Sequence, residues 1–488
     1  MNWHTIWNFI REWYWIPMLL IYAFIIITIL SENRSPSKSL AYILVLVFLP
    51  VIGLLVYYFV GRKPIFKKFK LKKKRLIDQQ KMQQYYRWLA PQMEERLQLL
   101  EQNIGDMAFP FRYLYYQDQS LISTDNTVTL LNIGEEKFPA LFKALANARS
   151  HIHIEYYIFA SDSVGNQITD ILLKKHDEGV EIRVIIDDVG SNHFKNIEKR
   201  LRKAGVTVLK TMPVAFSSLA NSNYRNHRKI AVIDGVIGFI GGINLDERYW
   251  NNGKHKLYWR DTTVQIEGQA VNLLQVQFFL SWFFAGGKDD FREDDHYFTT
   301  TLEKKGDAIV AIAASGPGSP VPYIMETILL AISQAKKSVR ICTPYFIPNE
   351  SLTSALVIAA ANGVKIELII PKKSDSFIVQ HASFSFIKPL LQRGVNIFLY
   401  EKGFIHAKTI SIDNSLAFVG TVNMDTRSFF LNFEITSIIY EPKLCKDLEA
   451  SFKNDKDNSK MVTLEQWKNR TMAERGFDSL CRLLAPLL

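Results

Sequence analysis

The pattern of hydrophobic and polar positions divides the chain into an apolar beginning and a long alternating remainder. Two early runs contain no charged residue, 13–30 (WYWIPMLLIYAFIIITIL) and 40–60 (LAYILVLVFLPVIGLLVYYFV). A helix of about 20 apolar residues can cross a bilayer core of about 30 Å. The pattern therefore predicts a transmembrane hairpin within residues 1–61, with spans at about 10–30 and 40–60.

A signal peptide or a pair of buried soluble helices would be the alternatives to this hairpin. The stretch SENRSPSKS after Leu30 has no small-residue cleavage site and leads into the second apolar run, which favours two spans. Basic residues near a span stay on the cytoplasmic side. Because Arg62 to Arg75 contains nine of them and the connector only Arg34 and Lys38, both termini and the remainder of the chain are predicted to be cytoplasmic.

The remainder repeats one order of strand and helix signals. In the first copy a strand at 151–159 precedes a helix closed by Gly179 and a strand ending at Asp187. The second copy has its strand at 338–346, its helix closed by Gly363 and its strand ending at Pro371, and the short strands AGVTVLK and RGVNIFLY follow in the respective copies. This duplication predicts an α/β protein of two tandem domains related by a pseudo-two-fold, each a mixed, largely parallel sheet flanked by helices.

Composition shifts place the domain boundaries. A chain of 488 residues is expected to form about three domains. Residues 62–105 are predicted as a basic juxtamembrane and helical linker, 106–310 as the first domain and 311–488 as the second, with a seam of charged residues followed by SGPGSP between them. The aromatic run 273–287 is predicted as a core helix, in preference to a surface element dipping toward a bilayer.

The net charge of +11 is concentrated in one segment. The nine basic residues between Arg62 and Arg75 account for all but two of these charges. A basic segment beside a span indicates contact with anionic lipid headgroups, and the nearly neutral remainder argues against nucleic acid as a partner. The cysteines, Cys342, Cys445 and Cys481, have no disulfide or metal-ligand spacing, which is typical of a reducing compartment.

One short pattern, His-x-Lys-x4-Asp, occurs twice, 179 positions apart. The copies read His227, Lys229 and Asp234 in HRKIAVID, and His406, Lys408 and Asp413 in HAKTISID. Each continues through a hydrophobic strand to GGIN or GTVN, ending at Asn244 and Asn423 with the same spacing from the histidine. Two copies with matching tails indicate a duplicated functional element.

Each copy predicts a strand, a tight turn and a second strand. Histidine and lysine two positions apart point to the same face of a strand. The aspartate falls at the turn, where it can bind backbone amides, so Asp234 and Asp413 are expected to serve mainly as framework. Two half-sites brought together would place two imidazoles, two ammonium groups and the amides of Asn244 and Asn423 around one phosphate. No carboxylate or Cys/His cluster suggests a metal or another cofactor.

These motifs resemble those of the phospholipase D superfamily, and the resemblance covers nearly the whole chain after Ile104. The apolar hairpin, the basic stretch, the SGP seam and the ending RLLAPLL are similar to the bacterial cardiolipin synthases. The resemblance implies a transfer in which one histidine forms a phosphohistidine and the other acts as acid and base. It assigns His227 as nucleophile and His406 as acid/base, and it places orienting acids at Asp261 and Glu434.

The resemblance implies an integral protein of the bacterial cell membrane that joins two phosphatidylglycerol molecules into cardiolipin and releases glycerol. Water as acceptor would give a phospholipase D, and another alcohol a different phosphatidyl exchange. A phosphodiester nuclease and a membrane scaffold with a decayed site are further alternatives. The neutral remainder disfavours a nuclease, and the intact motifs disfavour a decayed site.

Overall fold

The computed structural model describes residues 15–31, 36–49, 93–118, 120–213, 223–288 and 304–488, together with residues 13, 51, 53, 54, 57, 297 and 298. These fall into two units, each considered by itself. The N-terminal unit comprises residues 1–69 with 215–223, and the main unit comprises 70–214 with 224–488.

The N-terminal unit contains two apolar helices, α2 (Trp15–Ser31) and α3 (Pro36–Phe48), which pack together through Ile29 and Leu46. In the described part of the chain, no helix combines the length and the apolar character needed to span a membrane. The predicted spans and topology therefore stay predictions. The basic segment 62–75 lies outside the described residues.

The main unit is built on one sheet of fifteen strands. Counted from the centre of the sheet toward either edge, equivalent strands of the two halves follow in nearly the same order. From the centre, the first half consists of β1 (Ile122–Leu131), β8 (Thr263–Glu267), β6 (Ile237–Gly241), β5 (Lys229–Ile233), β2 (His151–Tyr156), β3 (Glu181–Asp187) and β4 (Thr207–Thr211). The second half consists of β9 (Ala308–Ser315), β16 (Glu434–Tyr440), β15 (Leu416–Gly420), β14 (Thr409–Ile412), β10 (Ser338–Cys342), β11 (Lys365–Pro371), β12 (Asn396–Tyr400) and β17 (Ser459–Met461).

This topology agrees with the predicted duplication and corrects two details. The strands and helices of both copies occur in the predicted order. The predicted "largely parallel" sheet is wrong, because only β2–β3–β4 and β10–β11–β12 pair in parallel and the other neighbours are antiparallel. One sheet per copy is also wrong, since the antiparallel pairing of β1 with β9 joins the halves into one sheet.

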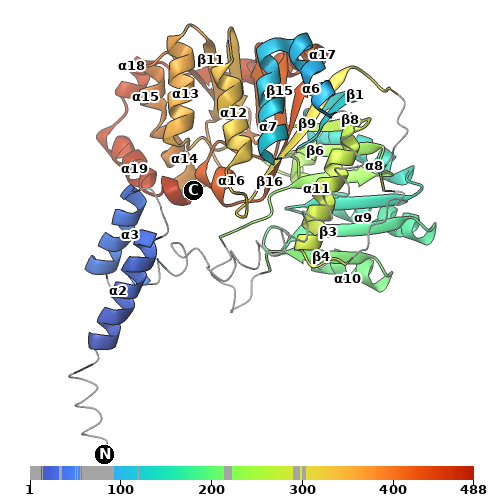
Figure 1. Ribbon diagram of the computed structural model, residues 1–488, viewed down its shortest axis with the longest axis horizontal. Helices are drawn as coiled ribbons and strands as arrows, with labels where there is room; N and C mark the ends of the chain where they lie inside the picture. Colours follow the sequence, from blue (N-terminus) through green and yellow to red (C-terminus); the bar gives the residue numbers. More distant parts are fainter. Residues whose placement is uncertain are drawn as a thin grey trace, which may run out of the picture. The chain divides into compact units, whose positions relative to one another are not determined.

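Helices cover both faces of the sheet, as Figure 1 shows. The helices of the first half are α8 (Gly134–Ala146), α9 (Ser163–Asp177), α10 (Lys195–Lys203) and α11 (Ala270–Phe284). Those of the second half are α12 (Tyr323–Ser333), α13 (Glu350–Ala361), α14 (Phe377–Phe384), α15 (Ile387–Leu391), α16 (Thr426–Phe430), α17 (Pro442–Asp457), α18 (Leu464–Lys468) and α19 (Met472–Arg482), followed by the 3-10 turn η5 (Ala485–Leu487). The run predicted as a core helix forms α11, with Phe278 and Phe279 buried.

The halves share their hydrophobic cores. Two helices precede the first half in the sequence: α6 (Met93–Ile104) and α7 (Phe109–Asp118), joined by the 3-10 turn η2 (Gly105–Ala108). Phe111 of α7 nevertheless packs in the core of the second half. On the opposite face, Leu448 of α17 packs in one cluster with Ile230 of the first half. The predicted boundary between residues 310 and 311 falls inside β9, and the two halves belong to one compact unit.

Candidate active site

Both His-x-Lys motifs lie on matching hairpins, β5–β6 and β14–β15. The central turn residues have positive φ in each case: 53° and 65° at Asp234 and Gly235, and 52° and 56° at Asp413 and Asn414. Two successive residues in the left-handed region are typical of the tight type I′ hairpin turn. The repeated motif therefore produces the same local structure twice.

The two motif aspartates are occupied with backbone groups. The carboxylate of Asp234 accepts hydrogen bonds of 2.8 to 3.0 Å from the amides of residues 149–151. Asp413 accepts bonds of 2.7 to 2.8 Å from the amides of residues 336–338. Each aspartate thus ties its hairpin to the start of the neighbouring strand, β2 or β10, which agrees with the framework role expected for both.

The motif histidines bind acids from the opposite half of the protein. His227 Nδ1 lies 3.0 Å and 3.1 Å from the two carboxylate oxygens of Glu434. His406 Nδ1 lies 2.7 Å from Asp261 Oδ2. Sequence reasoning selected both acids, but it did not reveal that they are exchanged between the halves. Among the described residues, the acid that binds Nδ1 of each motif histidine comes from the other half.

Short backbone pairings between the halves create this exchange. Strand β13 (Phe404–Ile405) pairs with β7 (Trp259–Arg260), and the amide of His406 donates to the carbonyl of Arg260 at 2.6 Å. In the other copy the amide of His227 donates to the carbonyl of Phe433 at 2.9 Å. In each pairing, the residues next to a motif histidine in one half run beside the residues that directly precede the acid in the other half. The side chains of the two pairs are thereby placed within reach of each other.

The two lysines are buried beside their histidines, on the predicted shared face. Lys229 Nζ donates to the carbonyl of His227 at 2.6 Å. Lys408 Nζ donates to the carbonyl of His406 and lies 3.7 Å from Asp261 Oδ2. Burial lowers the pKa of Lys229 to about 7 and also lowers that of Lys408. A bound phosphate anion would favour the charged form of both lysines.

Burial favours the neutral form of both histidines. Burial lowers the pKa of His227, although the charge of Glu434 opposes this effect. Burial and the charge of Lys408 lower the pKa of His406 to about 4. Burial alone would raise the pKa of Asp261 and Glu434, but neighbouring positive groups outweigh it and both stay ionised.

An ionised acid at each Nδ1 fixes the tautomer of the ring. We assign the ring proton to Nδ1, which donates to the carboxylate, so Nε2 carries the free lone pair. Lys408 Nζ also lies 2.8 Å from His406 Nδ1, but that nitrogen cannot accept from the lysine while it donates to Asp261. We therefore take the Asp261 contact as the hydrogen bond of His406 Nδ1. Both histidines then present a nucleophilic or basic nitrogen.

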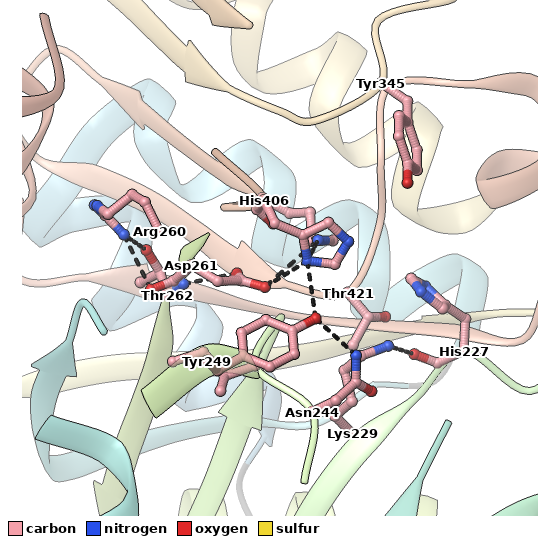
Figure 2. Close-up of polar contacts among 12 residues, drawn as sticks. His227, Lys229, Asn244, Tyr249, Arg260, Asp261, Thr262, Tyr345, His406 and Thr421 are labelled. Carbon is pink, nitrogen blue, oxygen red and sulfur yellow. Dashed lines mark hydrogen bonds and ion pairs between the residues drawn. The ribbon is translucent and has the colours of Figure 1, made fainter. Parts of the chain in front are cut away.

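The four central groups act on one another electrostatically across the two halves. The charge of Lys229 lowers the pKa of His406, and the charge of Lys408 lowers the pKa of His227. Lys408 also lowers the pKa of Lys229. Two half-sites therefore meet at one location, as Figure 2 shows for His227 and His406.

The two asparagines differ in their contacts. Asn244 Nδ2 donates to the hydroxyl of Tyr249 at 2.9 Å, and that hydroxyl lies 3.3 Å from His406 Nδ1. Asn423 is buried, and its Oδ1 has no hydrogen-bond partner among the described residues. Sequence reasoning missed Tyr249. The only signal for it is the aromatic pair in ERYW after the first motif, where the second copy has Ser428 and Phe429.

The acids are also held differently. Thr421 Oγ1 donates to Glu434 Oε2 at 2.5 Å, and Asn432 Nδ2 donates to Oε1 at 3.2 Å. The first copy has Gly242 in place of the threonine, and a Cβ there would lie 2.1 Å from Asp261 Oδ1. A side chain at this position would therefore displace the acid. The glycine provides space in one half, whereas the threonine provides a hydrogen bond in the other.

The residues around the two histidines contrast in polarity. Beside His227, Asn226 Nδ2 donates to the buried carboxylate of Glu155 at 2.7 Å, and Arg228 Nη1 donates to Ser281 at 3.0 Å. In the second half, Ile405, Cys342 and Ala407 occupy the positions that correspond to Asn226, Glu155 and Arg228, respectively. The first histidine thus lies on a polar network and the second on apolar packing. Among the described residues, no group of three or more potential metal-ligating side chains occurs.

Comparison with known proteins agrees with this geometry. The sequence profile described as "Cardiolipin synthase, PLD-like domain" matches residues 141–277 and 328–456, and one described as "Phospholipase D-nuclease N-terminal" matches 18–62. The structure is similar to that of the phosphatidylserine synthase of Haemophilus influenzae, with a TM-score of 0.61 at 14% identity over 78% of this chain and 100% of that chain. The fold and the paired motifs thus define a phospholipase D-like protein with both repeats in one chain.

Full-length relatives narrow this class to a family. A cardiolipin synthase of Oceanobacillus iheyensis is 37% identical over 97% of this chain and 98% of its own length. Cardiolipin synthase 2 of Staphylococcus epidermidis is 36% identical over 96% of each chain. The chain belongs to the cardiolipin synthase family of phospholipase D-like proteins.

Proposed function

We propose that this protein is a phosphatidyltransferase that converts two molecules of phosphatidylglycerol into cardiolipin and glycerol, without a cofactor. The observation that carries the proposal is the crossed pairing, which gives one site two imidazoles, each bound through Nδ1 to a buried acid of the opposite half. The names and the full-length similarity of the relatives support the choice of substrate.

In the first step, His227 Nε2 attacks the phosphorus of one phosphatidylglycerol. The bound phosphodiester anion favours the imidazolium form of His406, which carries a proton on Nε2. The N–P bond forms while the P–O bond to glycerol breaks, and the departing oxygen takes this proton, which leaves His406 neutral. Glu434 stabilises the positive charge that develops on His227, since its carboxylate is held by Thr421 and Asn432. The lysines, with Asn244 and Asn423, stabilise charge on the phosphoryl oxygens.

In the second step, neutral His406 takes the proton from a hydroxyl of the second phosphatidylglycerol. The oxygen attacks phosphorus, the new P–O bond forms and the N–P bond breaks. His227 is released and His406 is protonated again, so atoms and protons balance over the cycle. Asp261 holds His406 in one orientation throughout, as expected for the partner of a general acid and base.

The proposed substrate requires access to a bilayer. We assign anchoring in the bacterial cell membrane to α2 and α3, with the main unit on the cytoplasmic side beside anionic lipid. Support comes from the apolar sequence of both helices and from the outward exposure of Leu20, Phe24 and Ile27 on α2. The near-neutral charge outside residues 62–75 supports lipid rather than nucleic acid as the substrate class.

The test is to incubate the purified full-length chain with phosphatidylglycerol alone and to measure the lipid products and free glycerol. Cardiolipin and glycerol should appear in equal amounts, and His227→Ala or His406→Ala should reduce the rate by at least about 10³-fold. His193→Ala, at an exposed histidine, is the matched control and should retain activity. Phosphatidic acid without cardiolipin would show that water is the acceptor and would contradict the proposal.

A further inference from the structure

Helix α19 has an unusual distribution of polar and apolar side chains. Its described face toward the protein holds Asp478 and Cys481, the only buried residues of the helix. Phe477, Leu480 and Leu484 recur at helical spacing on its outer side. Soluble amphipathic helices normally bury their apolar stripe, so a helix that buries an aspartate and exposes its apolar stripe has the reverse arrangement.

The buried aspartate shows that this orientation is fixed by the fold. Asp478 lies 2.7 Å from His381 Nδ1 on α14 and 2.5 Å from Arg470 Nη1. The ring of Phe377 lies 5.9 Å from that of Phe477, so α14 and α19 pack side by side. Rotating α19 to bury its apolar stripe would break both contacts of Asp478.

We define the C-terminal apolar face as Phe377, Ile378, Phe477, Leu480, Leu483 and Leu484, whose exposed fractions range from 40% to 74%. Exposed apolar surface on this scale marks a contact site for a membrane or another protein. Figure 1 shows α14 and α19, which carry most of these residues, beside the C-terminus.

This face adjoins the candidate active site. Tyr345, whose ring lies 6.3 Å from that of His406, donates its hydroxyl to Asp375 at 2.8 to 2.9 Å. Asp375 lies two residues before Phe377, the first residue of α14. On the side of Glu434, Arg427 of α16 donates its amide to the carbonyl of Leu488 at 3.0 Å. The start of α14 therefore connects to the surroundings of His406, and the C-terminal residue connects to α16 on the side of Glu434.

We infer that the C-terminal apolar face inserts into the surface of an anionic bilayer and so holds the candidate active site close to its diacyl lipid substrate. The inference rests on the proposed function, which requires a lipid substrate. An amphipathic helix with Phe and Leu on one side and Arg on the other is suited to the membrane interface. Exposed Lys373, Arg475 and Arg482 lie on or next to the same elements, where they would meet acidic headgroups.

The test uses the full chain reconstituted in nanodiscs of phosphatidylglycerol and phosphatidylcholine. An environment-sensitive fluorophore is attached to Leu483→Cys, and to Lys203→Cys on α10 as a matched exposed control. The parent chain, whose described cysteines are buried, gives the labelling background. Doxyl-labelled lipid should quench the probe at residue 483 several-fold more strongly than the probe at 203.

Equal quenching at the two positions would overturn the inference. So would a probe at residue 483 that is shielded from water but not quenched by lipid, because the occupant would then be protein, either a second copy or another segment of this chain. Quenching does not depend on catalysis. A strongly quenched probe in a chain that makes no cardiolipin would refute the proposed function and leave the docking inference standing.

A second measurement connects the face to substrate entry. Phe477→Ser with Leu480→Ser should lower kcat/KM for phosphatidylglycerol in vesicles by about tenfold or more, because two apolar side chains no longer enter the bilayer. The rate with a short-chain phosphatidylglycerol below its micelle concentration should be unchanged. An equal loss on both substrates would indicate damage to the site and contradict the inference.

Discussion

At the residue scale, the site depends on charged groups that burial would normally neutralise. Lys229 and Lys408 are almost completely buried, and Asp261 and Glu434 are fully buried. Burial of unpaired ions is costly, and these groups persist because positive and negative members alternate across the two halves. In this arrangement burial favours the neutral form of His227, which attack on phosphorus requires, and both acids favour the ionised form. A bound phosphate anion favours the protonated form of His406, which a general acid requires.

Replacing Glu434 tests how the acid acts on His227. Glu434→Gln should reduce kcat by about 10² to 10⁴-fold, because an amide neither fixes the tautomer nor stabilises the imidazolium. Since the charge of Glu434 raises the pKa of His227, its removal should also move the acidic limb of the pH–kcat/KM profile to lower pH. Thr421→Val, which keeps the carboxylate, is the control and should leave that limb in place. An unshifted limb in Glu434→Gln would contradict a positioning role.

Replacing Lys229 tests the balance between function and stability. The pKa of Lys229 is about 7 in the folded protein and about 10.4 in the unfolded chain. Between these two pH values the unfolded chain binds more protons, so the free energy of unfolding rises with pH. Lys229→Met should therefore be inactive but more stable by about 1–4 kcal/mol near pH 7. Thermal unfolding in detergent should show this advantage shrinking toward pH 10. An advantage that grows with pH would contradict the assignment.

At the element scale, the hairpins are held by their turn aspartates. Asp234→Asn or Asp413→Asn replaces a carboxyl group that accepts from three backbone amides and should lower the free energy of unfolding by about 1–3 kcal/mol. The folded fraction should keep most of its activity at low temperature, since neither carboxylate contacts the histidines. Asp177→Asn, at an exposed position, is the control. Loss of kcat without loss of stability would indicate a direct role in the reaction.

At the scale of the whole molecule, the halves behave as one unit. Arg260 of the first half forms a buried ion pair of 2.9 Å with Asp455 on α17 of the second. Arg260→Met leaves that carboxylate buried and unpaired, so the free energy of unfolding should fall by about 3–5 kcal/mol. Calorimetry should still show one transition for the main unit. Two separate transitions in the parent protein would contradict a shared core.

Local patterns in the sequence predicted much of this architecture. The duplicated strand–helix order, the hairpins of both motifs and the framework role of Asp234 and Asp413 follow from periodicity and turn chemistry. The pairing of β1 with β9, the mainly antiparallel sheet and the exchange of Asp261 and Glu434 join residues far apart in the chain. Such long-range pairings leave no local periodic signal, and Tyr249 belongs to no repeated pattern.

The central claim is that one phosphodiester is broken and remade through a covalent intermediate on His227. The full-length enzyme should be mixed with phosphatidylglycerol, quenched within a turnover under conditions that preserve phosphohistidine, and digested for peptide mass spectrometry. A phosphatidyl adduct is expected on the peptide that contains His227, and none is expected in His227→Ala. Cardiolipin formation without any adduct, or an adduct confined to His406, would contradict it.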